Sequence, residues 1–507
     1  MNTKLITASL VTGWTAALFV GCQSLPSVGP DYVKPDFETP ELKMPDAGLP
    51  TTNLTETCEY KAAEGADDIR VNITTNELAQ WWTRFNDPLL VDLVESAQTN
   101  NLSYKMVCKR LEQASWGVDS ARAAFLPKAS VAGGWQRNWA HAQASSSGAR
   151  SHVNTKQVGF NADWEIDLFG GNRRRMEAAL AEVEVAGWTV DDAWVSLTTQ
   201  IGIQYITLRT TQDRIAVART NLKLQAETYE ILRSRLDSGI GDELAVNQCA
   251  YIVEQTRANI PALLAQEEQL KNTLAILAGK MPGDLEDVLA PLPEPRDWLL
   301  APQKVADLPL DMMRGRPDVM AMERQLAERT AMIGVARAQW FPRLFVSGMV
   351  GYQARNGKKL FDSDSFLASL GPSVSWPILQ GGAIHASVKI AEAQMHEAVY
   401  AYEHALESAY GDVRNTYSAY TQEYHRYQSL QAAVKAATDA VTISQDLYRN
   451  GLKDFNNVLD AQRSRLQCED ALDASRGQNT QNLLRHYGAL GGGLAQETLD
   501  DEDEEAE

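Results

Sequence analysis

The sequence predicts a mixed α/β fold in which two pairs of amphipathic strands each lead into a helix of nearly seventy residues. Three observations support this prediction: an internal repeat, strict alternation of apolar and polar residues in short segments, and two very long segments without proline. The chain has 507 residues, 44% of them hydrophobic, and is long enough for a large core.

The internal repeat covers most of the chain. "VDSARAAFLPKASVAG" at residues 118–133 matches "IGVARAQWFPRLFVSG" at residues 333–348, 215 positions later, whereas Trp164 matches Trp376 and Gly170 matches Gly382 at a spacing of 212. A hairpin loop that is three residues shorter in one copy would give this difference. We therefore divide the chain into repeat 1 at residues 81–281, a Pro-rich linker at residues 282–317 and repeat 2 at residues 318–490.

Each repeat begins with a predicted helix, which is followed by a predicted β-hairpin at about residues 127–168 in repeat 1 and 342–379 in repeat 2. In the first hairpin one face carries apolar residues from Val158 to Leu168, and the other carries four polar residues, namely Asn161, Asp163, Glu165 and Asp167. Strands of about ten residues with one apolar and one polar face are typical of an outer-membrane barrel, in which the polar face lines water. The alternation alone also fits a soluble sandwich.

The predicted long helices favour the membrane interpretation. Residues 171–238 and 382–450 contain no proline, so each segment can form a rod of about 100 Å. Both carry an apolar seam with a period of seven, at Ile201, Leu208, Ile215, Leu222, Tyr229 and Leu236, and at Val413, Tyr420, Tyr427, Val434, Val441 and Tyr448. Such a seam predicts left-handed coiled packing against neighbouring helices. Return helices at about residues 242–278 and 454–487 complete two helical hairpins.

The two ends of the chain differ in composition from the repeats between them. Residues 1–21 resemble an export signal, and Cys22 follows Gly21 as at a bacterial lipoprotein processing site, where the cysteine becomes acylated. An ordinary signal peptide with an incidental cysteine is the alternative. Residues 22–80 are then a lipid-anchored linker, and residues 491–507 are an acidic tail that we expect to be solvated.

Composition argues against several classes of function. The net charge of −19 disfavours a nucleic-acid partner, which requires a basic face. Cys58, Cys108, Cys249 and Cys468 include no CxxC pair, so no zinc site is indicated. His396 and His404 are eight residues apart, where a zinc-protease helix requires four. We therefore expect no enzyme, no metal and no cofactor other than a covalent lipid on Cys22.

Several phrases, read in order, resemble one known family. They are "VGPDYVKP" at residues 28–35, "WWTRFNDPLL" at 81–90, "WEIDLFGG" at 164–171, "RPDVMAMERQLAE" at 316–328, "IGVARAQWFPRL" at 333–344 and "PILQGG" at 377–382. On these phrases the chain resembles the outer-membrane factors of tripartite efflux systems, the TolC-like family, in their lipoprotein branch.

This resemblance implies a homotrimer in which each protomer gives four strands to a twelve-stranded outer-membrane β-barrel, continuous with a long periplasmic α-helical coiled-coil barrel. It also implies lipid anchoring in the bacterial outer membrane and passive export of small molecules. The expected partners are a periplasmic adaptor protein and an inner-membrane pump of the RND type. Two alternatives stay open: the outer-membrane conduit of a type I protein secretion system, and a structural periplasmic coiled-coil lipoprotein without a channel.

In this family the periplasmic end closes through contacts around the turns between the helices. The resemblance assigns the gate to six residues: Tyr448, Lys453, Asn457, Asp460, Asp242 and Glu243. Tyr448 and Lys453 match a tyrosine and a basic residue that hold the closed state, and Asp460 matches an acid at the constriction. Alternatively, Tyr448 only ends the apolar seam and the acids only favour helix starts.

The polar face of the second strand is the other predicted site. Three copies of Asp163, Glu165 and Asp167, with Asn161 beside them, would form acidic rings near the junction of the barrel and the helical tube. Rings of carboxylates favour cations in a pore. We therefore predict a cation-preferring channel, with a generic hydrophilic lining as the alternative.

Overall fold

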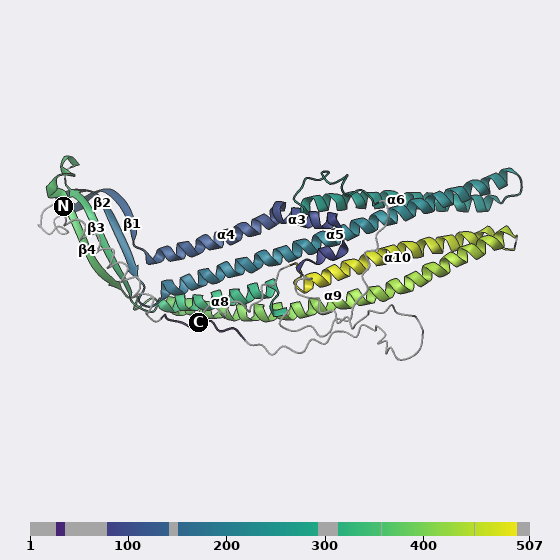
Figure 1. Cartoon of the computed structure of the whole chain (residues 1–507). Helices are drawn as coiled ribbons and strands as arrows, with labels where there is room; N and C mark the ends of the chain where they lie inside the picture. The colour runs from purple at the N-terminus through teal and green to yellow at the C-terminus, as the bar shows by residue number, and fades with distance from the viewer. Residues whose placement is uncertain are drawn as a thin grey trace. The chain divides into compact units, whose positions relative to one another are not determined.

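The computed structural model describes residues 27–35, 79–140, 151–292, 313–355, 357–450 and 452–493, which belong to two compact units (Figure 1). Unit 1 is drawn from Met1–Phe37, Lys109–Gly187 and Ala321–Glu403, and unit 2 from Glu38–Cys108, Trp188–Met320 and His404–Glu507. Each unit therefore combines parts of both sequence repeats. The predicted signal peptide, Cys22, Cys58 and the acidic end at residues 494–507 lie outside the described residues.

Unit 1 contains one antiparallel sheet with the order β1-β2-β3-β4. Its strands are β1 (Lys128–Ala140), β2 (Ser151–Ile166), β3 (Arg343–Ala354) and β4 (Phe366–Ser375). The hairpins of the two repeats join where β2 pairs with β3, and there Gly159 lies opposite Gly351. A Cβ atom added at Gly351 would lie 2.3 Å from the carbonyl oxygen of Val158, so this crossing requires glycine.

The strand register sorts the side chains of the sheet onto two faces. Directly paired residues share a face, and the pairs Val131↔Phe160 and Phe160↔Val350 place three apolar residues together. These residues are exposed, as are Trp135 and Leu370 on the same face, the latter by 81%. The opposite face carries polar pairs such as Ser130↔Asn161. An exposed apolar face of this size indicates contact with lipid or with another chain.

Both long helices contain 67 residues: α5 (Gly171–Asp237) follows β2, and α9 (Ala383–Arg449) follows β4. Gly170 and Gly382 stand before them with φ of +79° and +86°, which favour glycine. Within the described residues the other helices are η1 (Trp81–Phe85), α3 (Pro88–Asn100), α4 (Leu102–Arg122), η2 (Ala123–Phe125), α6 (Glu243–Leu277), α8 (Pro317–Ala338), η4 (Gly357–Lys359), η5 (Ser363–Ser365) and α10 (Phe455–Ala489). In the described part of the chain, no helix combines the length and the apolar character needed to cross a bilayer.

Residues 27–35 lie against the rest of unit 1 through polar contacts. The backbone N–H of Val28 donates to the carbonyl of Phe169 at 3.2 Å, and Asp31 forms an ion pair with the buried Arg174 at 2.5 Å. Lys34 forms an ion pair with Glu323 of α8 at 2.9 Å. Burial alone would raise the pKa of Glu323, but the hydrogen bonds from Lys34 and Arg324 lower it below its usual value. Two of the phrases that carry the family resemblance, at residues 28–35 and 316–328, therefore contact each other.

The core of unit 2 is built around the tryptophans of a third phrase, "WWTRFNDPLL". Trp81 is fully buried, and a Cβ atom added at Gly202 of α5 would lie 2.5 Å from its ring. Asp87 caps α3 by accepting from the N–H of Leu89, and it also accepts from the hydroxyl of Tyr205. The phrase therefore begins a helix and fixes that helix to α5.

The seven-residue seam is the packed face of the long helices, as predicted. Ile201, Leu208 and Val413 are at most 1% exposed, and none of the twelve seam residues falls in the exposed class. Helix α10 approaches α5 especially closely, because a Cβ atom added at Gly477 would lie 2.2 Å from Oγ1 of Thr210. Small residues allow this close helix contact.

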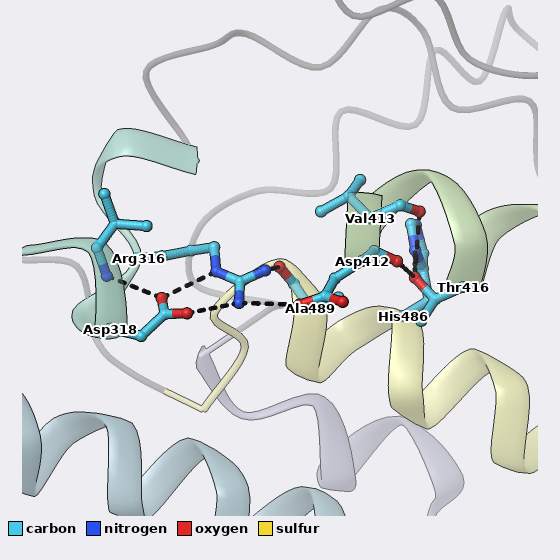
Figure 2. A network of polar contacts seen from close by, with 8 residues as sticks. Arg316, Asp318, Asp412, Val413, Thr416, His486 and Ala489 are labelled. Atoms are coloured by element: carbon cyan, nitrogen blue, oxygen red, sulfur yellow. Dashed lines mark hydrogen bonds and ion pairs between the residues drawn. The ribbon is translucent and has the colours of Figure 1, made fainter. Parts of the chain in front are cut away.

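A partly buried arginine, Arg316, connects the start of α8 with α9 and α10 in unit 2 (Figure 2). The guanidinium of Arg316 donates two hydrogen bonds to Asp318, at 3.0 and 2.8 Å, and a third to the carbonyl of Ala489 at 2.8 Å. It also forms an ion pair with Asp412 at 3.6 Å. Burial alone would lower its pKa, but the bonds and charges of these carboxylates raise it, so Arg316 stays charged.

His486 lies in the same region at the end of α10. Its Nδ1 atom is 3.1 Å from the hydroxyl of Thr416, and within the described residues its Nε2 atom has no hydrogen-bond partner. The side chain is 2% exposed, and burial lowers its pKa from 6.5 to about 4. The folded chain therefore holds His486 neutral at pH 7.

This pKa predicts a pH-dependent stability. As the pH falls from 6.5 to about 4, the unfolded chain binds a proton on His486 and the folded chain does not, so the free energy of unfolding falls by roughly 3 kcal/mol. His486→Gln should remove this part of the decline in melting temperature between pH 7 and pH 4. The exposed His404→Gln should keep it. Equal declines for wild type and His486→Gln would contradict the assignment.

Candidate channel gate and lining

The turns between the helices of each hairpin meet at a small apolar cluster in unit 2. This tip cluster contains residues from both helical hairpins: Leu232, Ala245, Val246, Cys249, Ile252, Phe455, Val458 and Leu459. Tyr229, Leu236 and Tyr448, the last residues of the two seams in this region, pack against it. The heptad pattern therefore brings the predicted gate tyrosine to the point where the two hairpins meet.

The first turn is shaped by its backbone. Gly239 has a φ of +76°, and the N–H of Ile240 donates to the carbonyl of Arg235 at 3.0 Å, which closes the end of α5. Asp242 then begins α6, because its carboxylate accepts from the N–H of Leu244 at 3.0 Å. The Asp242 carboxylate is thus engaged in a helix cap within its own protomer.

Tyr448 contacts a base rather than an acid. Its hydroxyl accepts a hydrogen bond from Nη1 of Arg235 at 3.2 Å, and the guanidinium lies over the tyrosine ring, 5.4 Å from its centroid. The ring of Phe455 packs edge-on against Tyr448, with 5.1 Å between the centroids. Arg235 is on α5 and Tyr448 on α9, so this contact links the two hairpins directly.

Arg235 was not among the residues predicted for the gate. A signal for it exists in the repeat: Tyr448 corresponds to Leu236 at a spacing of 212 residues, and Arg235 immediately precedes Leu236. Leu236 and Tyr448 both pack against the tip cluster. A long side chain next to one of them can therefore reach the other.

The remaining predicted gate residues do not form one cluster within the protomer. Asn457 donates to the carbonyl of Asp454 at 3.2 Å at the start of α10, and Asp460 has an exposed ion pair with Arg463 at 3.5 Å. For Lys453 and Glu243 the described part of the chain provides neither an ion pair nor a hydrogen bond through the side chain. These two charges are therefore available to another molecule.

The predicted lining residues have unequal surroundings. Asn161 and Asp163 lie on the polar face of β2, where Asp163 is exposed and pairs in register with Lys128. Glu165 instead accepts two hydrogen bonds from Arg343, at 2.8 and 2.5 Å.

Asp167 lies just beyond β2. It accepts from the N–H of Arg173 at 3.0 Å and lies 3.5 Å from the guanidinium of the same residue. Two of the three predicted acids are therefore neutralised by arginines. Asp163 is the acid for which the described residues offer no ion pair.

A cavity of about 270 Å³ lies in unit 1 where the strands end and the helices begin. Its lining includes Glu165, Asp167, Arg175, Arg343 and Gln380. Acidic and basic groups are thus mixed at this level.

The Arg235–Tyr448 contact predicts an effect on gating. An exposed cation–π contact is worth about 0.5 to 1 kcal/mol, so Arg235→Ala should raise the open probability by about two- to fivefold for each contact removed. Single-channel recording in planar bilayers measures this. Arg233→Ala, an exposed neighbour on the same helix, is the matched control. Equal open probabilities for the two variants would contradict a role for the contact.

Comparison with known proteins places the chain among outer-membrane channels. The family model described as "Outer membrane efflux protein" matches residues 93–280 and 308–492. Nodulation protein T of Rhizobium leguminosarum bv. trifolii is 29% identical over 408 residues, 80% of this chain and 85% of that protein. The toluene efflux pump outer membrane protein TtgF of Pseudomonas putida is 26% identical over 425 residues, 84% of this chain and 87% of its own.

Among solved structures, the outer-membrane channel OprN is similar with a TM-score of 0.77 and 30% identity, covering 92% of this chain and 99% of that chain. These comparisons confirm the predicted fold class, a protomer with four strands and long helices from a trimeric outer-membrane channel. They also confirm the predicted role as the outer-membrane channel component of an efflux system. The chain belongs to the outer membrane efflux protein family.

Proposed function

We propose that three copies of this chain close one twelve-stranded barrel, which is the outer-membrane exit duct of a tripartite efflux pump. The observation that carries this proposal is the sheet of unit 1. It has an exposed apolar face, and within the described residues β1 and β4 each have one unpaired edge. If β1 of one copy pairs with β4 of the next, the sheet closes and has no unpaired edge. Such closure is required in lipid, where every backbone N–H and C=O group needs a hydrogen-bond partner.

The water-filled path would follow the polar face of the sheet. Asn161 and Asp163 lie on that face, and α5 and α9 continue the chain directly after β2 and β4. Small molecules would pass without chemical change, so we expect no catalytic activity. The driving energy would come from an inner-membrane pump of the RND type, reached through a periplasmic adaptor. The name of the relative TtgF, which refers to a toluene efflux pump, supports a small-molecule cargo.

We also propose that Cys22 carries a covalent lipid. The bound segment at residues 27–35 begins only five residues after Cys22, and Val28 and Asp31 hold it against unit 1. Five residues span at most about 18 Å. A lipid on Cys22 would therefore stay close to unit 1, which contains the apolar face.

Within each copy, the Arg235–Tyr448 contact would hold the closed state of the duct. Lys453 and Glu243 would pair between copies, together with Asp460. Each exposed pair contributes only about 0.2 to 1 kcal/mol. The closed state would therefore be weak enough for a docking adaptor to open it.

Fractionation of the full-length protein tests the proposed function. After inner and outer membranes are separated, the extracted protein should be found in the outer fraction with a native mass of about three chains of 55.9 kDa. Loss of the chain should also make cells accumulate more of the pump's substrates. A monomer of 55.9 kDa that leaves the membrane in the Cys22→Ser variant would overturn the barrel and the proposed function with it.

The charges on the lining predict the ion preference of the open channel. We expect cation preference, because no arginine among the described residues forms an ion pair with the carboxylate of Asp163. Asp163→Asn should move the reversal potential in a salt gradient toward zero, whereas Arg343→Gln should increase cation preference by freeing Glu165. Ser130→Ala, on the same face without a charge, is the control. Anion preference in the wild type would contradict the prediction.

A further inference from the structure

The loop end of the sheet in unit 1 carries cations among aromatic side chains. Figure 1 shows the connection between β3 and β4 at the end of the strands away from α5, α8 and α9. Near this end the register pairs Trp135 with Lys156 and Lys156 with Ala354. Paired residues share a face, so Lys156 projects from the apolar face of the sheet. A lysine is unusual on a face that otherwise carries exposed apolar residues such as Phe160 and Leu370.

Two more groups on the apolar face continue this arrangement. Arg137 is two residues beyond Trp135 and shares its face, and its guanidinium lies 5.1 Å from the ring centroid of Trp139. All three of these residues of β1 are exposed. The outer half of β1 thus presents two indole rings with a cation between them.

The connection between β3 and β4 adds three further cations, Arg355, Lys358 and Lys359, all exposed. A Cβ atom added at Gly357 would lie 2.6 Å from Nζ of Lys156, so the ammonium group of Lys156 lies against the first residue of η4. The basic side chain on the strand and the basic loop therefore form one surface.

Aromatic rings surround this surface as well. Phe361 is 73% exposed and packs edge-on against Tyr352, with 5.7 Å between ring centroids; Tyr352 also contacts Phe366 at 6.0 Å. Tyr352 pairs in register with Val158 and Phe366, so it shares the apolar face with Lys156. We call the whole set the rim patch: Arg137, Lys156, Arg355, Lys358 and Lys359, with Trp135, Trp139, Tyr352, Phe361 and Phe366.

We propose that the rim patch binds the phosphate groups of anionic lipids in the outer leaflet of the outer membrane. This inference rests on the proposed function, which directs the loop end of the sheet away from the periplasmic helices. Aromatic side chains concentrate at the boundary between lipid and water, where long basic side chains reach the headgroups. Guanidinium and ammonium groups bind phosphate through charge-assisted hydrogen bonds.

The charge of the patch is unlike that of the rest of the chain. It groups five cations in a protein of net charge −19, with Asp362 and Asp364 as acids in the same loop. The position of the patch also indicates whether its ligand is a lipid or a solute inside the duct. Lys156 and Arg137 lie on the apolar face, whereas a departing anion would meet the polar face that carries Asn161. Lipid phosphate is therefore the occupant that the register favours.

Binding to the full-length trimer in detergent tests this inference. Diphosphorylated lipid A should bind and raise the melting temperature, whereas lipid A stripped of phosphate should bind at least about tenfold more weakly. Inorganic phosphate alone should neither raise the melting temperature nor compete. The triple variant Lys156→Gln, Lys358→Gln, Lys359→Gln should also lose at least about tenfold in affinity for the phosphorylated lipid.

Lys128→Gln is the matched control, because this exposed lysine lies on the polar face at the other end of the same sheet. Equal losses in the control and the triple variant would overturn the inference, as would equal binding of the two forms of lipid A. Effective competition by inorganic phosphate would assign the patch to solutes instead. An outer-membrane trimer without lipid selectivity refutes only this inference, whereas a monomer refutes the proposed function.

Discussion

A peptide N–H or C=O group that enters lipid without a hydrogen-bond partner costs several kcal/mol, and the four-stranded sheet has two edges of such groups. Most of the remaining structure follows from this constraint. One copy cannot place its apolar face in a bilayer unless its edges are paired by other copies. The long helices that follow β2 and β4 then have to pack around a common axis, which is what a seven-residue seam permits.

Ionic contacts with one partly or fully buried partner hold together segments that are far apart in the sequence. Arg316 connects the start of α8 to Asp412 of α9 and to the end of α10, while Glu323 of the same helix binds Lys34 near the N-terminus. Breaking these contacts would leave the partly buried Arg316 or the buried Glu323 with fewer opposite charges around it, which destabilises the fold. The short phrases that reveal the family in the sequence are therefore the places where distant segments meet.

Local periodicity explains why so much of the fold could be predicted. A period of two locates β2, and a period of seven identifies Ile201, Leu208 and Val413 as the buried face, because each pattern lies within one element. The partners of Tyr448 and Glu165 could not be predicted in this way. Arg235 is 213 residues from Tyr448, and Arg343 is 178 residues from Glu165. Such pairs depend on which separate elements pack side by side, and periodicity within one element does not predict this.

The two junctions between strand and helix show how a duplicated structure becomes unequal. Gly170 and Gly382 occupy equivalent positions with nearly the same φ. At Gly170 an added Cβ atom would lie 2.7 Å from Ser27 of the N-terminal segment, whereas at Gly382 no atom of the described residues outside its immediate neighbours lies within 4 Å of an added Cβ atom. One glycine is therefore constrained by both backbone conformation and enclosure, the other by conformation alone. Two equivalent positions of the internal repeat therefore tolerate substitution differently, because a segment outside the repeat covers only the first.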